Sequence, residues 1–201
     1  KRVRYGLSLS APVGGGAPAR VTSSAGSDPD EAQRIEVPRR PGSPTRLTLT
    51  VNHTLVLSDR IVIRSGLDSV NLLEGGAIGI ASGRVRHQLD GTAGITSRGV
   101  GARMGVTWRG RSSLESRING ETEELRFSPF LLVNLRAFTE AVRLFGRNAW
   151  TRSMRLSLNV TNLLKDRQSV RDRLGDTPLQ YQPAYRDPLG RTVEFEVRKV
   201  F

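Results

Sequence analysis

The most constraining feature of this sequence is an alternation of apolar and polar residues with a period of two. Between Met154 and Asn162, apolar residues occupy every second position, and arginine, serine, asparagine and threonine lie between them. Because successive side chains of a β-strand point to opposite faces, this pattern predicts a strand with one apolar and one wet face. Six further segments share the pattern, at residues 3–9, 47–57, 85–96, 102–109, 125–137 and 193–201.

The length of these segments bears on what covers their apolar faces. The segments run for seven to thirteen residues, and five of the seven reach the nine or more that a tilted strand needs to cross a bilayer core. Strands of soluble sandwiches are shorter, typically about five or six residues. Alternation sustained over about ten residues is typical of outer-membrane barrels, with apolar side chains outside and polar ones inside. The sequence therefore predicts an all-β fold of antiparallel transmembrane strands.

The connections between the predicted strands differ in character. Residues 12–44 hold six of the ten prolines and a run of three glycines, so we expect a flexible linker. Ser97–Gly101 is short enough for a tight turn, with Gly99 and Gly101 supplying permissive backbone. We expect a helical turn within the connection at 138–150, polar loops at residues 111–122 and 165–190, and a loop with a mixed polar and apolar patch at 66–83.

Composition narrows the function classes. The net charge is +12, and 28 of the 31 basic residues are arginines that are spread from Arg2 to Arg198. A nucleic-acid-binding protein is expected to cluster them, so the spread argues against that class. The absence of cysteine excludes disulfides and Cys-based metal sites. No apolar run approaches 18 residues, and because the chain starts at Lys1 we expect a segment of a longer protein.

No catalytic constellation is visible in the sequence. The two histidines, His53 and His87, lie outside any metal-ligand spacing and beside no serine–aspartate pair, so we interpret them as strand or interfacial residues. The acidic clusters at 28–31 and 121–124 are interpreted as solvated loop charge. The glycine runs lack the Lys-Ser/Thr pair of a phosphate loop. We therefore expect no enzyme activity, no cofactor and no metal.

Three pieces of sequence stand out in the last 50 residues. The predicted strand that ends at Asn162 continues into Leu163-Leu164, a polar stretch follows with Tyr181-Gln182-Pro183 and Asp187–Arg191, and a terminal strand ends in Lys199-Val200-Phe201. Together these pieces resemble the C-terminal end of a TonB-dependent outer-membrane receptor. Upstream, Leu72–Gly76 and Leu125–Phe127 are also similar to receptors of this kind. The resemblance is specific over the last 50 residues and extends over most of the chain.

The resemblance implies a fold larger than this chain. Receptors of this family have a barrel of 22 strands, an N-terminal plug domain and a motif that contacts TonB; this chain, over residues 1–201, is similar to the C-terminal part of the barrel and lacks the plug. We thus expect about seven long strands of a larger barrel, open at both edges, in the outer membrane of a Gram-negative bacterium. Its expected partners are outer-membrane lipid, upstream strands and plug, TonB through the missing N-terminal part, and the insertion machinery.

The resemblance also implies a function, namely TonB-energised uptake of a scarce nutrient such as a ferric siderophore. Counting strands back from the C-terminus places 165–190 and 111–122 outside the cell, and 138–150, 97–101 and 12–44 in the periplasm. Arginines that alternate with apolar residues would face the lumen, where they could pair with plug acids, attract an anionic ligand or simply solvate the wall. These lumen-facing candidates are Arg86, Arg103, Arg126, Arg136 and Arg155.

Two further sets of residues carry expectations. The terminal strand resembles the signal that the insertion machinery reads, with Lys199 as the exception on its apolar face; the signal comprises Val193, Phe195, Val197 and Phe201. Aromatic residues near strand ends are expected to form interfacial girdles, although ordinary core filling is an alternative. They are Tyr5, Trp108, Phe127, Trp150 and Phe201.

Two other function classes remain open from the sequence. One is a small structural or adhesive outer-membrane β domain, which needs closure and commonly has an even number of strands. The other is a soluble basic β protein that binds nucleic acid, which predicts salt-sensitive binding to polyanions and solubility without detergent.

Overall fold

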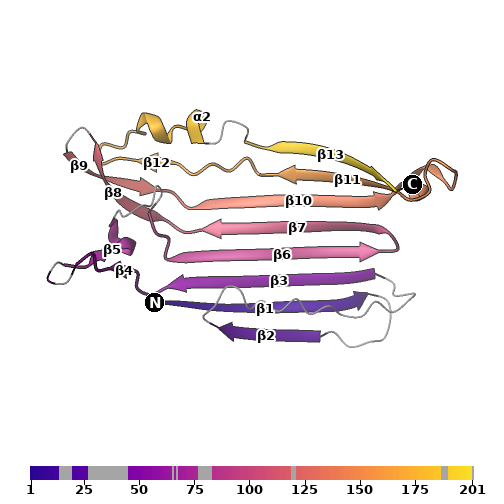
Figure 1. Cartoon of the computed structure of the whole chain (residues 1–201), viewed down its shortest axis with the longest axis horizontal. Coiled ribbons are helices and arrows are strands. Elements are labelled where there is room, and N and C mark those ends of the chain that lie inside the picture. The colour runs from indigo at the N-terminus through magenta and orange to yellow at the C-terminus, as the bar shows by residue number, and fades with distance from the viewer. Residues whose placement is uncertain are drawn as a thin grey trace.

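The computed structural model describes residues 1–13, 20–26, 45–64, 66, 68–76, 83–118, 121–186 and 190–200. These residues are mostly β-structure, and one large open sheet of eight strands dominates (Figure 1). Its order is β13-β11-β10-β7-β6-β3-β1-β2, and every neighbouring pair is antiparallel. The strands are β1 (Arg2–Val13), β2 (Arg20–Gly26), β3 (Thr45–Val56), β6 (His87–Ser97), β7 (Val100–Arg109), β10 (Phe130–Glu140), β11 (Met154–Thr161) and β13 (Thr192–Lys199).

The register of this sheet places like residues beside like residues. One row of cross-strand partners, from β1 to β13, is apolar throughout: Leu9, Leu49, Ala93, Met104, Leu135, Val160 and Val193. The adjacent row, which points to the other face, carries no large apolar residue: Ser10, Thr48, Gly94, Arg103, Arg136, Asn159 and Glu194. A slip of one residue would turn a strand's apolar side chains to the other face. The pairing register therefore keeps the apolar side chains of all seven strands on the same face. The predicted apolar and wet faces are therefore confirmed as continuous surfaces.

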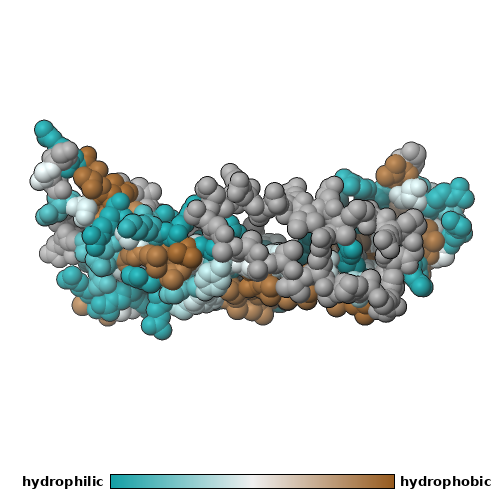
Figure 2. Space-filling model, turned by 90° about the horizontal axis from the view of Figure 1, so that it is seen from below, coloured by the Kyte–Doolittle hydropathy of each residue, from teal (hydrophilic) through white to brown (hydrophobic). Residues whose placement is uncertain are grey.

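The apolar face lies largely uncovered. Large hydrophobic side chains on it remain exposed from the first strand to the last, and Phe195 on β13 is 65% exposed. Figure 2, seen from the β2 edge, shows brown apolar atoms along one border of the molecule. Monomeric soluble proteins rarely leave an apolar surface of this extent in water, which indicates that something else covers the face. The exposed set includes Val3, Leu7, Leu47, Leu49, Ile95, Met104, Leu158, Val193, Phe195 and Val197.

The single strand predicted over 125–137 is wrong, because the structure divides it in two. β9 (Glu121–Phe127) ends before Pro129, and β10 begins at Phe130. Proline has no N–H to donate to a strand ladder and holds φ fixed, so it interrupts the pairing. Only β10 belongs to the large sheet, while β9 pairs with β8 (Ser112–Ile118) and β12 (Val170–Arg171) in a sheet of three strands.

The three-stranded sheet carries the only hydrophobic core cluster among the described residues. Leu125 is fully buried, and Phe127, Leu114 and Val170 are buried around it, with Tyr181 packed edge-on against the Phe127 ring at 5.6 Å. Two expectations fail here. Ser112–Ile118 form a strand and Glu121 begins another, where we expected a polar loop over 111–122. Phe127 fills a core, where we expected a membrane girdle, because its strand leaves the large sheet.

The connections lie at the two ends of the large sheet as the strand count predicts. The three-stranded sheet lies at one end, with η2 (Leu179–Tyr181) and α2 (Pro183–Arg186) above it in Figure 1; the short pair β4 (Arg60–Ile61) and β5 (Val70–Asn71), with η1 (Leu72–Glu74), lies there too. The β6–β7 turn and α1 (Ala141–Phe145) lie at the opposite end. The helical turn predicted within 138–150 is thereby confirmed. Among the described residues, no helix is both long and apolar enough to span a membrane.

The expected tight turn at 97–101 forms, but only Gly99 of its two glycines lies in the turn itself. Arg98 and Gly99 both have positive φ, at 41° and 88°, which is the geometry of a two-residue hairpin turn. Gly101 lies inside β7, where a Cβ atom would come within 2.5 Å of the Phe138 ring. Gly99 therefore supplies the backbone freedom, whereas Gly101 permits a close side-chain approach.

One of the two edges of the large sheet differs from expectation. β13 is an edge, as predicted, but β1 is not, because β2 pairs along it from Arg4↔Gly26 to Ser10↔Arg20. β2 lies within the segment 12–44 that we expected to be a linker. The rest of that expectation, at 14–19 and 27–44, falls outside the described residues.

Candidate anion-binding hollow

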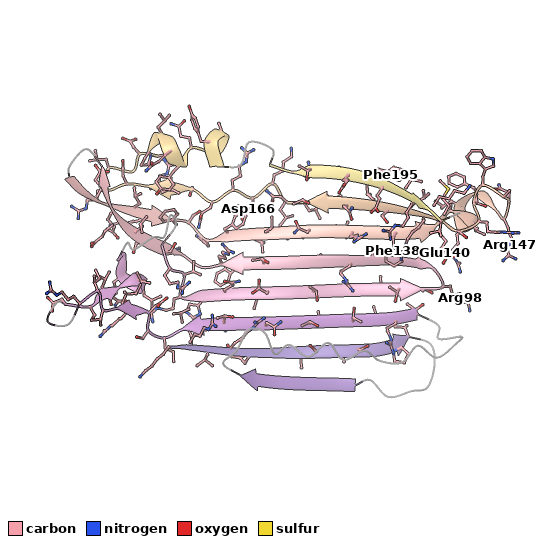
Figure 3. All side chains as sticks on the ribbon, viewed as in Figure 1. Arg98, Phe138, Glu140, Arg147, Asp166 and Phe195 are labelled. Carbon is pink, nitrogen blue, oxygen red and sulfur yellow. The ribbon has the colours of Figure 1, made fainter. Side chains whose placement is uncertain are left out.

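A hollow on the polar face lies where the β6–β7 turn meets the β10–β11 connection. It is open and encloses about 1320 Å³. Five strands contribute to it, namely β3, β6, β7, β10 and β11, together with residues of the two connections. In Figure 3, Phe138, Glu140, Arg98 and Arg147 all lie at this end of the sheet. Its volume exceeds the roughly 300–1,000 Å³ typical of a small-molecule pocket, so it has room for a larger group.

Part of the hollow is lined by residues with small side chains, which occupy little of its volume. Thr48, Gly94 and Thr96 come from β3 and β6. A Cβ atom at Gly94 would lie 2.8 Å from the Thr48 hydroxyl, and 4.0 Å from Nε of Arg103. The glycine therefore makes room for the Thr48 hydroxyl, while a side chain there would only touch Arg103.

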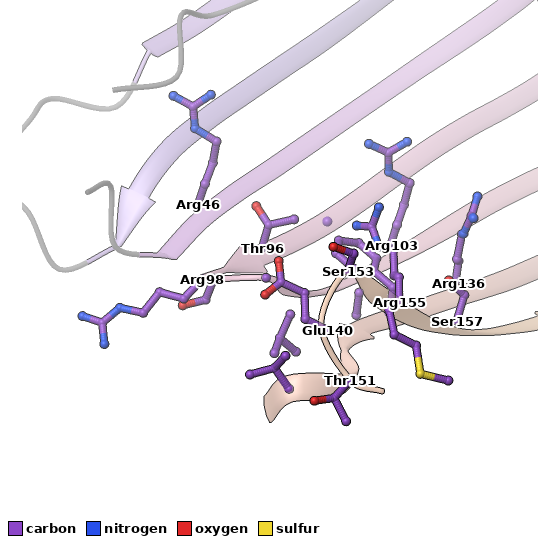
Figure 4. Close-up of a pocket in the computed structure, with 18 of the residues that line it drawn as sticks. Arg46, Thr96, Arg98, Arg103, Arg136, Glu140, Thr151, Ser153, Arg155 and Ser157 are labelled. Atoms are coloured by element: carbon purple, nitrogen blue, oxygen red, sulfur yellow. The ribbon is translucent and has the colours of Figure 1, made fainter. Parts of the chain in front are cut away.

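Arginine dominates the rim. Seven arginines and one acidic residue, Glu140, line the hollow. Figure 4 shows Arg46, Arg103 and Arg136 rising from separate strands on the same side of the sheet, while Arg98 extends away from it. Guanidinium groups bind carboxylate and phosphate oxygens through paired hydrogen bonds, so this excess of arginine suits an anion. The arginines are Arg46, Arg98, Arg103, Arg136, Arg147, Arg152 and Arg155.

The arginines differ in how their charge is compensated. Arg136 lies 3.7 Å from Glu196, with both side chains substantially exposed. Arg155 lies 4.0 Å from the Phe138 ring centroid, a cation–π contact. Arg103 is the cross-strand partner of Arg136, which places two like charges side by side, and no acidic side chain of the described chain forms an ion pair with Arg103. Like charges directly opposite each other destabilise a sheet unless an anion lies between them.

The structure brings together three of the five arginines predicted to face a lumen. Arg103, Arg136 and Arg155 line the hollow. Arg86 precedes β6, where its carbonyl accepts from the Val56 N–H, and Arg126 lies on β9 beside Glu124 at 3.1 Å. Arg126 belongs to the three-stranded sheet, so its alternation with apolar residues does not place it on the wall of the large sheet.

Four arginines of the hollow escaped the sequence analysis. Arg98 lies in the β6–β7 turn, and Arg147 and Arg152 lie in the β10–β11 connection, so none of them belongs to an alternating segment. Arg46 is the polar neighbour of Leu47, but it directly precedes the strand predicted at 47–57. The register now places Arg46 in one row with Thr96, Gly101 and Phe138.

The residues of the expected assembly signal lie on the apolar face. Val193, Phe195 and Val197 are exposed there on β13, and Phe201 falls outside the described residues. Lys199 shares this face, and its ammonium lies 4.9 Å from the centroid of the Trp150 ring. Lys199 is the charged exception on the apolar face of β13, and the Trp150 ring is its aromatic neighbour at the end of the sheet.

Tyr5 and Trp108 lie in a single row of the apolar face, together with His53 and Leu89. Trp150 lies beyond the opposite end and is 77% exposed. Of the acidic clusters, Asp28, Asp30 and Glu31 lie outside the described residues. In the part of the chain that is described, no three His, Cys, Asp or Glu side chains gather closely enough to hold a metal ion.

Comparison with known proteins adds no relative. No protein-family model matches the chain, no curated protein sequence is significantly similar to it, and no solved structure matches its fold.

Proposed function

We propose that this chain forms part of the wall of an outer-membrane β-barrel of the TonB-dependent receptor type. Such a receptor would take up a scarce nutrient, for example a ferric siderophore, with energy supplied through TonB. The single observation that carries the membrane part of the proposal is the exposed apolar face, which runs in register across seven strands from β1 to β13. Lipid acyl chains are the natural cover for such a face.

The dimensions of the sheet support the same proposal. β1 and β3 have 12 residues each, β6 and β10 have 11, and β7 has 10. These five strands reach the 9–11 residues that a tilted strand needs to cross a bilayer, whereas β11 and β13 have 8 residues each. The edge strand β13 carries unpaired backbone groups, which a membrane does not tolerate. A neighbouring strand from elsewhere in the receptor would satisfy them.

The polar face supports the receptor part of the proposal. In a barrel this face would line the lumen, and the basic hollow would lie at the end that carries the β6–β7 turn. Its excess of arginine suits an acidic group of the upstream plug domain or an anionic ligand. The small three-stranded sheet would then lie at the extracellular end of the wall.

Single-cysteine labelling tests the membrane part, because the chain contains no native cysteine. Cysteine would be placed at Leu47, Leu49 and Leu158 on the apolar face, and at Thr48, Thr92 and Asn159 on the polar face. In intact outer membranes we expect the first set to react only with a membrane-soluble maleimide and the second set with a water-soluble one. Equal labelling of both sets by the water-soluble reagent, with the protein in the soluble fraction, would overturn the proposal.

The same preparation tests the soluble alternative. A basic β protein that binds nucleic acid would stay in solution without detergent and would bind polyanions with steep salt dependence. Ligand uptake needs a separate measurement. The receptor gene would be deleted and growth measured on scarce iron, with the receptor that carries this segment supplied in trans.

A further inference from the structure

Three hydrogen-bonding side chains interrupt the apolar face at the end opposite the basic hollow. Tyr5 on β1 is the cross-strand partner of His53 on β3. His87, the first residue of β6, lies diagonally across from His53, since their partners are Leu55 and Leu89 respectively. A largely apolar face thus carries both histidines of the chain within one cluster.

The two imidazole rings are closely juxtaposed. Nε2 of His53 lies 3.2 Å from Nδ1 of His87, and the ring planes are nearly parallel, at 11°. On the other side of the His53 ring, Nδ1 lies 2.6 Å from the Tyr5 hydroxyl. The Tyr5 contact therefore occupies one nitrogen of His53 and directs the other toward His87.

This geometry suits two ligands on one metal ion. Nitrogen ligands lie about 2.0–2.1 Å from a zinc-sized cation, so two of them in a tetrahedral site are about 3.4 Å apart. In the structure the two nitrogens meet head-on, since they are 3.2 Å apart and the ring centroids 5.4 Å, so both rings must turn for their nitrogens to face one ion. A metal-bound histidine commonly donates its second N–H to an oxygen, which is the position that Tyr5 occupies.

We propose that His53 and His87 form a binding site for a transition-metal cation of the imidazole-binding kind, such as Cu²⁺, Ni²⁺ or Zn²⁺. In this state the Nδ1–H of His53 donates to the Tyr5 hydroxyl oxygen, while Nε2 of His53 and Nδ1 of His87 hold the metal. Water completes the coordination, because His87 is the first residue of β6, at the end of the sheet, and the described residues offer no cluster of three or more metal-binding side chains. Affinity should follow the order of divalent ions, with Cu²⁺ strongest, and Ca²⁺ should not bind.

Titration of the purified full-length chain in detergent micelles with Cu²⁺, Ni²⁺, Zn²⁺ and Ca²⁺ tests the site. For Cu²⁺ we expect one equivalent, with electron paramagnetic resonance that shows coupling to two nitrogen ligands. His87→Gln should weaken Cu²⁺ binding at least 10-fold and leave coupling to one nitrogen. Tyr5→Phe should weaken it about 10–100-fold and keep both nitrogens, because the hydroxyl acts through His53.

Controls separate the site from background binding. The double variant His53→Gln/His87→Gln reports any Cu²⁺ held elsewhere, including at the terminal amine, and circular dichroism confirms that each variant keeps its β-structure. Binding of Cu²⁺ that the double variant retains in full would overturn the proposal. Bound Cu²⁺ whose spectrum shows no coupling to nitrogen would overturn it as well.

Discussion

The guanidinium of Arg155 lies 4.0 Å from the centroid of the Phe138 ring, and the ring itself lies against Gly101 on the neighbouring strand. Three strands thus contribute one layer each to a stack beside the basic hollow. The stack exists because Gly101 has no side chain: a Cβ atom there would lie 2.5 Å from Cζ of Phe138. The glycine leaves room for the ring, and the ring in turn contacts the arginine.

The first prediction concerns Gly101→Ala. The added methyl group displaces the Phe138 ring and with it the Arg155 contact, which should cost about 1–3 kcal/mol of unfolding free energy. Urea unfolding of the purified protein measures this loss. Gly105→Ala on the same strand is the matched control, because a Cβ atom there meets nothing within 4 Å. An equal loss in both variants would point to the backbone and not to the ring.

The second prediction compares the two faces of β11. Leu158 is 40% exposed on the apolar face, and Asn159 lies beside Glu194 on the polar face, with Nδ2 3.4 Å from Oε2. In lipid vesicles, Leu158→Arg should destabilise the protein by about 2–4 kcal/mol if it lies near mid-bilayer. Asn159→Arg should cost far less, because the new charge faces Glu194.

Urea midpoints of these two variants in vesicles give the answer, and similar losses would contradict the assignment of the faces. Ser157, the other polar neighbour of Leu158, is a poorer control. It is only 5% exposed, so an arginine there would disturb packing whatever covers the opposite face.

The third prediction concerns the core of the three-stranded sheet. Leu125→Ala removes a fully buried side chain and should cost about 2–5 kcal/mol locally. Leu174→Ala is the matched control, since Leu174 is 89% exposed and its truncation should change little. Hydrogen exchange resolves the two sheets: amides of β8 and β9 should exchange faster in Leu125→Ala, while those of β6 and β7 should not. Uniform acceleration would show that both sheets unfold as one unit.

The fourth prediction concerns Asp166, whose hydrogen bonds join the segment after β11 to the start of β10; we call this contact the Asp166 clamp. The carboxylate of Asp166 accepts a 2.6 Å hydrogen bond from the Leu131 N–H, and its carbonyl accepts from the buried Asn162 side chain at 3.0 Å. Asp166→Ala leaves the Leu131 N–H without its acceptor, which should cost about 1–3 kcal/mol. Asp166→Asn keeps an acceptor oxygen and should lose less. Exchange of the Leu131 amide is the direct readout, and unchanged protection in Asp166→Ala would contradict the clamp.

The sequence alone determined most strands of the large sheet and their faces, but it revealed neither β2 nor the division at Pro129. Alternation places Met154, Leu156 and Leu158 on one side of β11 whatever lies next to it, because the pleat itself has a period of two. The pair Arg98-Gly99 likewise determined a turn, since a two-residue hairpin requires positive φ at both positions and glycine adopts it freely.

Tertiary structure decided everything that depends on strands meeting. Alternation gives no register, so it could not show that Arg46 shares a row with Phe138, or that Arg103 lies beside Arg136. Nor could alternation show that Phe127 and Leu131 lie in different sheets, because both residues fit the same period of two. The break at Pro129 places them on β9 and β10, which belong to different sheets. A local pattern fixes which way a side chain points, whereas its neighbours come from hydrogen-bonded pairing between residues far apart in the chain.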